Sequence, residues 1–408
     1  MENIDNINNL NFNNNFFQKS LLEKDLIKNK KYIGYTCSYI PEEILISGGL
    51  DAIRLKGNEE SNLADGYLPT NFCPYIKAVW EELYENSNPI PIVFATSCDG
   101  MRRLNDIFST YKKDSASFIL DVPKKNDKTS IDYFISRLKK LIEFIEKESQ
   151  IQKITYLNLL QAIEILNKKR QLLLELTKIY ETNNFNLITA SNYFSILDLS
   201  LSTNNNLFIQ DLENYLNYLR LNLDKNKKNI LNENDKKIMV IGNYINDMNF
   251  WDIFTELNIK VISSDLCLSS RYFEFQINLN DIDVNNNINN NFKANDLLEL
   301  KNSKNLEDKL EILIKLIAKS YLNKPSCFRM VSLKEKINDI KTKIMSKNIK
   351  AVIFSSLKFC DNTLYFYPEL KEELIKLNIP SLYLDMDYSN SSIGQIKTRI
   401  EAFYEMLF

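Results

Sequence analysis

Short apolar runs alternate with amphipathic stretches along the first third of the chain. The apolar runs lie at residues 32–35, 52–55, 90–95 and 118–123. Pro41 and Pro74 each stand at the expected first turn of a helix, and residues 101–111 form a third helical stretch. Strands that alternate with helices pair in parallel and are covered on both faces. This pattern therefore predicts an α/β fold.

The middle of the chain has the spacing of long amphipathic helices. Apolar residues recur at 131, 134, 135, 138, 141, 142 and 145, and Ser130 is the expected N-cap of this helix. A second long helix is predicted over 156–180. Both helices are expected to pack between two domains and to serve structure rather than chemistry.

A second α/β unit follows. Its predicted strands lie at 238–241, 260–263, 351–354 and 381–384. Its predicted helices lie at 250–257 and 306–321, and a terminal helix runs through Arg399 and Phe403. Residues 285–291 are almost wholly asparagine and are expected to form a surface loop. We therefore predict two Rossmann-like parallel-sheet domains with a helical insertion between them. The expected boundaries are a leader at 1–30, a first α/β domain at 31–125, a helical segment at 126–234 and a second α/β domain at 235–408.

Composition excludes several classes of protein. A hydrophobic content of 44% can fill real cores, and a net charge of −2 argues against a nucleic acid or an anionic membrane as partner. No run approaches the roughly 18 apolar residues of a membrane span, and residues 1–15 lack the features of a signal peptide. We therefore expect a cytoplasmic protein with reduced cysteines. With eight glycines and no nucleotide-binding loop, any ATP dependence must reside in a partner.

The chain has no histidine, so metal binding would fall on thiolates, which suit iron–sulfur clusters and zinc. Each half carries three cysteines, and two of the three follow predicted strands. Because ligands of parallel sheets gather beyond the carboxyl ends of strands, two facing domains would bring all six thiols into one cleft. The six are Cys37, Cys73, Cys98, Cys267, Cys327 and Cys360.

The spacing of these cysteines favours a cluster over other thiol sites. No Cys-x-x-Cys pair or ferredoxin spacing is present, since the closest two cysteines are Cys73 and Cys98. A lone cysteine is more often a small buried hydrophobe, but six matched contexts favour ligands. Cys73 and Cys98 also precede helices, where the positive helix end is expected to lower a thiol's pKa.

Several longer motifs surround the cysteines. The most specific are residues 71–75 (Asn-Phe-Cys-Pro-Tyr), 96–103 (Thr-Ser-Cys-Asp-Gly-Met-Arg-Arg) and 356–361 (Ser-Leu-Lys-Phe-Cys-Asp), with 387–389 and 394–403 near the C-terminus. From about Lys31 onward, the chain resembles the 2-hydroxyacyl-CoA dehydratase and benzoyl-CoA reductase subunit superfamily. It departs from the pattern at Asn362 and at 269–271, which affects the expected loop shape more than ligation.

The resemblance implies a function. Dehydratase subunits of this superfamily hold one 4Fe–4S cluster with three cysteines, whereas double-cubane cluster proteins hold two linked 4Fe–4S cubes (8Fe–9S type) with six. Six cysteines favour the double-cubane branch. The resemblance then implies an anaerobic homodimeric oxidoreductase that takes low-potential electrons from an ATP-hydrolysing 4Fe–4S activator and reduces a small molecule.

Three other hypotheses remain open. The chain could be a 2-hydroxyacyl-CoA dehydratase subunit, a lyase component with a single 4Fe–4S cluster. In that case Cys37, Cys267 and Cys327 would be ordinary core residues. The third hypothesis is a non-catalytic electron-storage protein with the same cluster. The fourth is a structural relative without a cluster, which six intact cysteine contexts disfavour.

By the family pattern, one cube falls to Cys73, Cys98 and Cys360, and the other to Cys37, Cys267 and Cys327. A division into the first three and the last three is the alternative.

Charged neighbours of the cysteines are further candidates. Glu42 and Glu43 could relay protons, although acidic residues are common at helix starts for electrostatic reasons alone. Arg102, Arg103 and Arg271 could offset cluster charge or bind an anionic substrate, and an ordinary ion pair is the alternative for each.

Overall fold

The computed structural model of the chain describes residues 17, 32–57, 63–86, 89–150, 153–182, 187–202, 204–225, 237–245, 247–279, 305–330, 333–388 and 392–407. The predicted leader at 1–30, apart from Phe17, and the asparagine-rich loop at 285–291 lie outside these residues.

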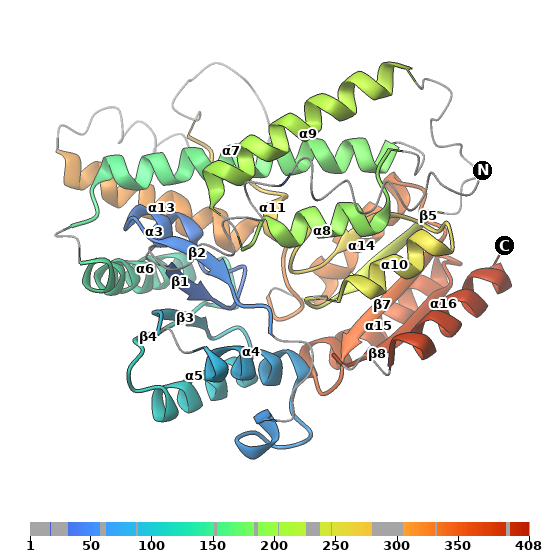
Figure 1. Cartoon of the computed structure of the whole chain (residues 1–408), viewed down its shortest axis with the longest axis horizontal. Helices are drawn as coiled ribbons and strands as arrows, with labels where there is room; N and C mark the ends of the chain where they lie inside the picture. The colour runs from blue at the N-terminus through green and yellow to red at the C-terminus, as the bar shows by residue number, and fades with distance from the viewer. Residues whose placement is uncertain are drawn as a thin grey trace.

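Two four-stranded parallel sheets form the centre of the molecule (Figure 1). The first sheet has the order β2-β1-β3-β4, with β1 at Tyr32–Tyr35, β2 at Asp51–Arg54, β3 at Ile92–Ala95 and β4 at Ser117–Leu120. The second has the order β6-β5-β7-β8, with β5 at Lys237–Gly242, β6 at Lys260–Asp265, β7 at Ala351–Leu357 and β8 at Ser381–Met386. The strand order is the same in both sheets. The predicted α/β fold with two parallel sheets is confirmed.

Helices follow most strands and fill the middle of the chain. Near the first sheet are α3 (Glu42–Ser47), the 3₁₀ helix η2 (Leu63–Gly66), α4 (Pro74–Glu85) and α5 (Asp99–Tyr111). The middle holds α6 (Lys128–Ser149), α7 (Tyr156–Thr182), α8 (Ala190–Leu199) and α9 (Asn205–Lys225). The rest are α10 (Met248–Glu256), α11 (Ser270–Phe273), α13 (Leu306–Asn323), α14 (Leu333–Ser346), α15 (Asp361–Lys376) and α16 (Ile393–Leu407).

Alternation along the strands covers both faces of the first sheet. Ile92 and Phe94 of β3 lie in one hydrophobic core, whereas Val93 and Ala95 lie in another. Successive strand residues point to opposite faces, so a strand that is apolar throughout must be buried on both sides. The core around Phe94 also contains Ile353 of β7, so the two sheets share hydrophobic packing.

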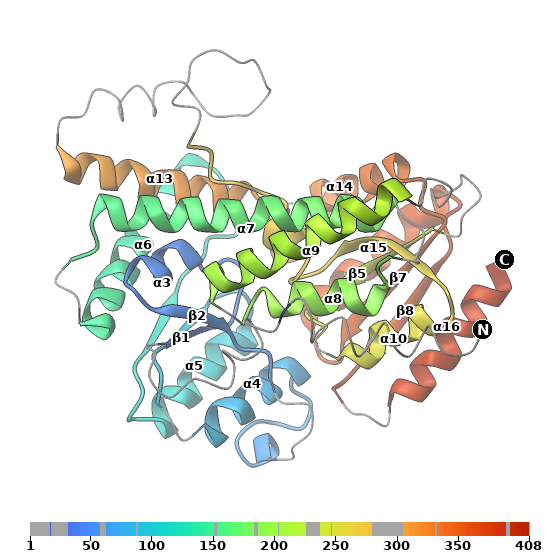
Figure 2. The same ribbon diagram turned by 45° about the horizontal axis from the view of Figure 1, so that its top comes forward.

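The helix α7 links the two halves. It contacts α3 and α13 on the side of the first sheet, and β6 and α11 on the side of the second (Figures 1 and 2). Although α13 follows β6 along the chain, it packs on α6 and α7. The predicted domain boundaries stay a prediction.

The N-cap of α6 differs from the prediction. Asp127 is the N-cap, and one of its carboxylate oxygens accepts a 2.8 Å hydrogen bond from the backbone N–H of Ser130. The prediction of Ser130 as the cap was wrong, because the helix begins at Lys128, before its apolar pattern does.

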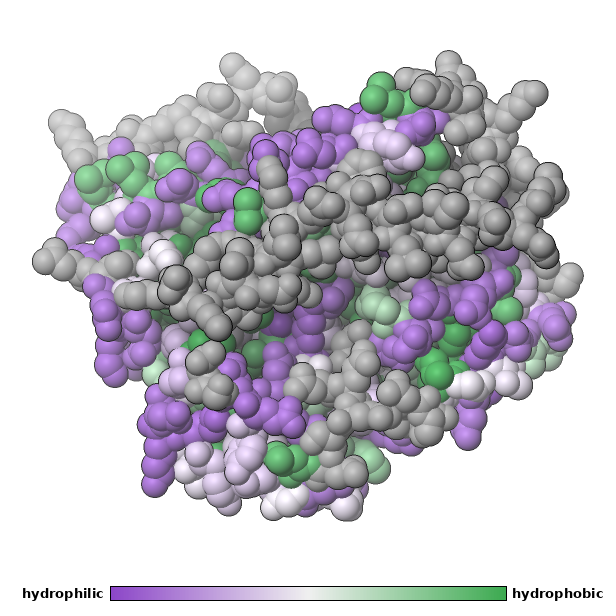
Figure 3. Space-filling model, viewed as in Figure 1, coloured by the Kyte–Doolittle hydropathy of each residue, from purple (hydrophilic) through white to green (hydrophobic). Residues whose placement is uncertain are grey.

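The coloured surface in Figure 3 is mainly hydrophilic, with hydrophobic residues scattered across it. Within the described ranges, no helix combines the length and the apolar character that crossing a membrane requires.

Candidate metal centre

The strand ends position most of the six cysteines. Cys37 follows β1 and Cys267 follows β6, while Cys73, Cys98 and Cys360 are the N-cap residues of α4, α5 and α15. Cys327 lies in the loop between α13 and α14. All six thiols are free and partly buried. Five of them therefore stand where a strand ends or a helix begins, as the sequence predicts.

Three of the cysteines share a cavity of about 560 Å³, and we call them the open thiol group. They are Cys73, Cys98 and Cys360. Cys360 and Cys98 both act electrostatically on Cys73. The side-chain amide of Asn243, just past β5, donates a 3.3 Å hydrogen bond to the sulfur of Cys360. The cavity opens beyond the carboxyl ends of β3 and β7, where parallel sheets place their ligands.

The other three cysteines form the inner thiol group. They are Cys37, Cys267 and Cys327. Cys37 and Cys327 each interact electrostatically with Cys267, and each also interacts with Tyr39. The hydroxyl of Tyr39 accepts a 3.3 Å hydrogen bond from the backbone N–H of Cys327. Cys98 of the open group also interacts with Cys37 and Cys327, so the two groups adjoin.

The helix starts do not lower the pKa values of the open thiols. Burial raises the pKa of Cys73 to about 12 and that of Cys98 to about 12, and the hydrogen bonds from backbone N–H groups offset only part of this effect. The predicted lowering was wrong, because desolvation of the thiolate outweighs the helix end. These thiols are therefore protonated without metal, and metal binding must release their protons.

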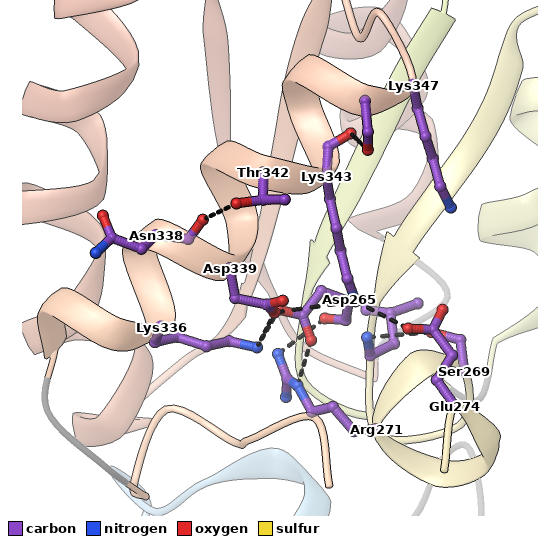
Figure 4. Close-up of polar contacts among 12 residues, drawn as sticks. Asp265, Ser269, Arg271, Glu274, Lys336, Asn338, Asp339, Thr342, Lys343 and Lys347 are labelled. Atoms are coloured by element: carbon purple, nitrogen blue, oxygen red, sulfur yellow. Dashed lines mark hydrogen bonds and ion pairs between the residues drawn. The ribbon is translucent and has the colours of Figure 1, made fainter. Parts of the chain in front are cut away.

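A buried polar cluster reaches the inner thiol group from the second sheet. The guanidinium of Arg271 lies 3.8 Å from the sulfur of Cys267 and donates a 2.6 Å hydrogen bond from Nε to the carboxylate of Asp265. The ammonium of Lys336 lies 2.5 Å from the same carboxylate. Figure 4 shows Arg271 and Lys336 both pointing toward Asp265. Both alternatives for Arg271 have a contact in the structure: the sulfur of Cys267 for charge compensation, and Asp265 for an ordinary ion pair.

Two more buried cations accompany this group. Arg54, at the end of β2, stacks over the rings of Tyr35 and Tyr244, with distances of 5.9 Å and 5.2 Å to the ring centroids. Lys324 precedes Cys327 and donates a hydrogen bond to the carbonyl oxygen of Ser38. Neither cation was predicted from the sequence. An arginine inside the apolar run 52–55 was the available signal for Arg54.

The candidate acids lie in ion pairs. Glu42 accepts a 2.8 Å hydrogen bond from the hydroxyl of Tyr35 and lies 3.2 Å from the ammonium of Lys169. Glu43 lies 2.6 Å from the guanidinium of Arg170. Burial opposes ionisation of Glu42, but Lys169 and the Tyr35 hydroxyl outweigh it and lower the pKa of Glu42 below its ordinary value.

The candidate arginines of α5 differ in position. Arg102 lines the cavity of the open thiol group, 3.8 Å from Asp121. Arg103 is exposed and lies 3.5 Å from both Asp99 and Asp106. Arg102 is therefore placed to face a bound molecule, and Arg103 forms an ordinary surface ion pair.

The donor chemistry fits an iron–sulfur cluster. Six thiols lie in two adjoining groups of three, and buried cations lie beside the inner group. Two nitrogens of Arg54 have no hydrogen-bond partner among the described residues. An anionic cluster would compensate such a charge. In the described part of the chain, no three cysteine, aspartate or glutamate side chains lie close enough to share one metal ion. The thiolates that hold a 4Fe–4S cube each bind a different iron, so they lie farther apart than the ligands of one metal ion.

Comparison with known proteins gives the family. The model of the 2-hydroxyglutaryl-CoA dehydratase D-component family matches residues 37–292 and 292–407. The chain belongs to this family. All six cysteines of this family member lie within the matched residues.

Three curated relatives are each similar to almost the whole chain. The (R)-phenyllactyl-CoA dehydratase beta subunit of Clostridium sporogenes is 22% identical over 94% of this chain and 97% of its own length. Lactoyl-CoA dehydratase subunit beta of Anaerotignum propionicum is 21% identical over 93% and 92%. The (R)-2-hydroxyglutaryl-CoA dehydratase subunit beta of Acidaminococcus fermentans is 22% identical over 95% and 96%. This D-component family member is thus similar to dehydratase beta subunits.

Proposed function

We propose that this member of the dehydratase D-component family is an iron–sulfur reductase component with a double-cubane cluster. The observation that carries the proposal is the pair of adjoining three-thiol groups, one at an open cavity and one among buried cations. A single cube needs only three of these cysteines. With a single cube, the three thiols of the second group and several buried cations would have no role.

Each thiol group has its own role in the proposal. Cys73, Cys98 and Cys360 hold one cube, and Cys37, Cys267 and Cys327 hold the other. The bound cluster supplies one-electron transfer at low potential. Asn243 and Arg271, which contact Cys360 and Cys267, orient these ligands and stabilise their negative charge.

The cavity of the open thiol group receives the substrate. Its lining includes three cationic side chains, those of Arg102, Lys124 and Arg329. Arg329 is held in place by a 3.1 Å hydrogen bond to the carbonyl oxygen of Val122. These cations favour a small substrate that carries negative charge or gains it on reduction.

The electrons come from a partner in this proposal. The chain has eight glycines and no phosphate-binding loop, so any ATP dependence resides in a partner. This partner is a 4Fe–4S activator that hydrolyses ATP. The functional unit is a homodimer. Both points rest on the resemblance to double-cubane cluster proteins.

A dehydratase subunit with a single 4Fe–4S cluster is the second candidate. The names of the three relatives favour it, since each is a beta subunit of a 2-hydroxyacyl-CoA dehydratase. The open thiol group alone would then hold the cluster, at a cavity large enough to admit part of a substrate.

Iron and acid-labile sulfide per chain separate the two functions. The wild type, Cys73→Ala from the open group and Cys267→Ala from the inner group are purified without oxygen and assayed. The double cubane predicts about eight irons, with roughly half lost in each variant. About four irons, lost in Cys73→Ala and unchanged in Cys267→Ala, would instead establish the single-cluster dehydratase subunit.

A further inference from the structure

Six lysine and arginine side chains are buried in the described part of the chain, and they fall into two classes. Four lie against a carboxylate: Lys169 with Glu42, Arg170 with Glu43, and both Arg271 and Lys336 with Asp265. The other two, Arg54 and Lys324, have no carboxylate partner within the described ranges, although they are only 3% and 4% exposed. These two cations are the exception that requires an explanation.

Arg54 is held by aromatic rings rather than by an anion. Its guanidinium stacks over Tyr35 and Tyr244, and its Nε and Nη1 atoms have no hydrogen-bond partner in the part of the chain that the structure describes. Cation–π contacts replace only part of the hydration that a buried guanidinium loses. The groups that act electrostatically on it include Cys267 and Cys37. Arg54 therefore lies beside the inner thiol group with hydrogen-bonding capacity unused.

Lys324 has a similar environment from the opposite half of the sequence. Its ammonium lies 4.7 Å, 5.1 Å and 5.0 Å from the ring centroids of Tyr39, Phe275 and Tyr321. It donates a hydrogen bond to the carbonyl oxygen of Ser38, the residue after Cys37. Burial lowers the pKa of Lys324 to about 7, and the Cys37 thiol opposes this effect. The cation is thus buried at a cost that an adjacent anion would remove.

We propose that Arg54 and Lys324 are built-in counter-charges for an anionic iron–sulfur group bound by the inner thiols. With Arg271 they place three buried cations around Cys37, Cys267 and Cys327. This inference rests on the proposed function, because it requires a second cube. It gives the two thiol groups different roles: the inner group holds the first electron, and the open group passes electrons to the substrate.

The charge distribution sets the order in which the groups are reduced. One electron from a low-potential donor adds one negative charge and breaks no bond. Buried cations stabilise that charge strongly, whereas at the open group Arg102 and Lys124 are exposed and screened by water, and Arg329 is only partly buried. Arg54, Lys324 and Arg271 therefore hold the first electron at the inner group. The open group, next to the cavity, passes electrons to the substrate.

The test compares metal-free and cluster-loaded protein in the variants Arg54→Met, Lys324→Met and Arg54→Lys. Redox titration followed by electron paramagnetic resonance gives the reduction midpoints, and thermal unfolding gives the stabilisation that the cluster confers. In the loaded protein, Arg54→Met is expected to lower one midpoint potential by at least about 59 mV, which is a tenfold change in the equilibrium constant for one-electron reduction. The other midpoint potential is expected to stay unchanged. Arg54→Lys, which keeps the charge, is expected to restore most of the shift.

The thermal measurements separate a counter-charge from a packing residue. Without metal, Arg54→Met and Lys324→Met are expected to unfold at or above the wild-type temperature, since each removes an unpaired buried charge. With the cluster loaded, both are expected to unfold below it. Arg170→Met is the matched control, because its guanidinium is buried but paired with Glu43. It is expected to destabilise both forms equally and to shift neither midpoint.

Three outcomes decide the matter. Loss of about half the iron in Arg54→Met or Lys324→Met supports the inference, because the inner cube then depends on the cation. Eight irons, unshifted midpoints and equal destabilisation of both forms would overturn this inference and leave the double cubane intact. About four irons in the wild type would overturn the double cubane and this inference together. If Arg54→Met does not fold, the same comparisons apply to Lys324→Met.

Discussion

The carboxylate of Asp265 holds two buried cations in place beside the inner thiol group. It is fully buried and contacts both Arg271 and Lys336 (Figure 4). Burial opposes its ionisation, but the two cations outweigh this effect and keep the pKa of Asp265 well below its usual range. Arg271 reaches the sulfur of Cys267 from this anchored position. The surroundings of the Cys267 thiol therefore depend on Asp265, which acts through Arg271.

Asp265→Asn should destabilise the protein strongly. The substitution leaves Arg271 and Lys336 buried without a charge partner, which costs about 3–5 kcal/mol. Urea unfolding of the metal-free chain measures the loss. Asp339→Asn is the matched control, because Asp339 is 42% exposed and lies 3.8 Å from Lys336; about 0–1 kcal/mol is expected there. Equal losses in the two variants would show that Asp265 does not hold Arg271 and Lys336 in place.

Glu42 should make stability depend on pH in the acid range. Because its pKa in the folded chain is below the unfolded value, its ion pair stabilises the protein above that value. The stabilisation is lost as the pH falls through the folded pKa. Glu42→Gln should therefore be about 3–5 kcal/mol less stable than wild type at pH 7, with a difference that shrinks toward pH 3.

Urea unfolding at several pH values measures this dependence, and exposed Glu369→Gln serves as the control. A constant difference between Glu42→Gln and wild type at all pH values would show that the Lys169 pair is not linked to protonation. Any proton transfer through Glu42 would have to compete with Lys169, which favours the ionised carboxylate.

Close packing between β5 and β7 brings Asn243 to Cys360. Gly242, the last residue of β5, lies against Ser355 of β7, and a Cβ atom built there would stand 2.3 Å from the Ser355 carbonyl oxygen. Only glycine permits this approach. The two strands thereby deliver the side-chain amide of Asn243 to the open thiol group.

Gly242→Ala is expected to push the two strands apart. Overpacking of this kind costs about 1–3 kcal/mol. It should also move Asn243 away from Cys360 and lower the iron retained by the open group. Gly394→Ala in α16 is the control, since a Cβ there meets nothing within 4 Å. Unfolding curves and iron content are measured for both variants. Wild-type values for Gly242→Ala would show that the approach of β5 and β7 does not depend on glycine at this position.

The sequence predicts the strands and helices with strong periodicity. All eight strands among the described residues were expected, because short apolar runs must be buried in a sheet that is covered on both faces. The helices α14 and α15 were not expected. The interior Pro368 and many charged residues obscure the apolar pattern of α15. Local pattern therefore locates the sheet better than the helices that pack around it.

The candidate site was predictable only in part. The cysteines follow strand ends, and that relation is local in sequence. Arg54 and Lys324 were missed, because their burial results from packing between segments that are distant in sequence, which no local pattern records. Arg54 lies over Tyr244, and Lys324 contacts Ser38 and Tyr39. For the same reason Glu42 and Glu43 could not be recognised as partners of Lys169 and Arg170 in α7.

The whole molecule brings residues that follow both sheets to one cavity. Both sheets have the same strand order, and each supplies cysteines from its carboxyl edge. In the proposed function the open group faces the substrate and the inner group stores charge among buried cations. This arrangement requires two linked cubes in one chain.

The most direct test of that requirement is native mass spectrometry of the protein prepared without oxygen. The mass beyond the polypeptide gives the metal content of each chain, and the total mass gives the number of chains. The account predicts a dimer with about eight irons and bridging sulfide on every chain. A mass that corresponds to about four irons per chain would contradict the double cubane, and would identify the open thiol group as the site of a single cluster.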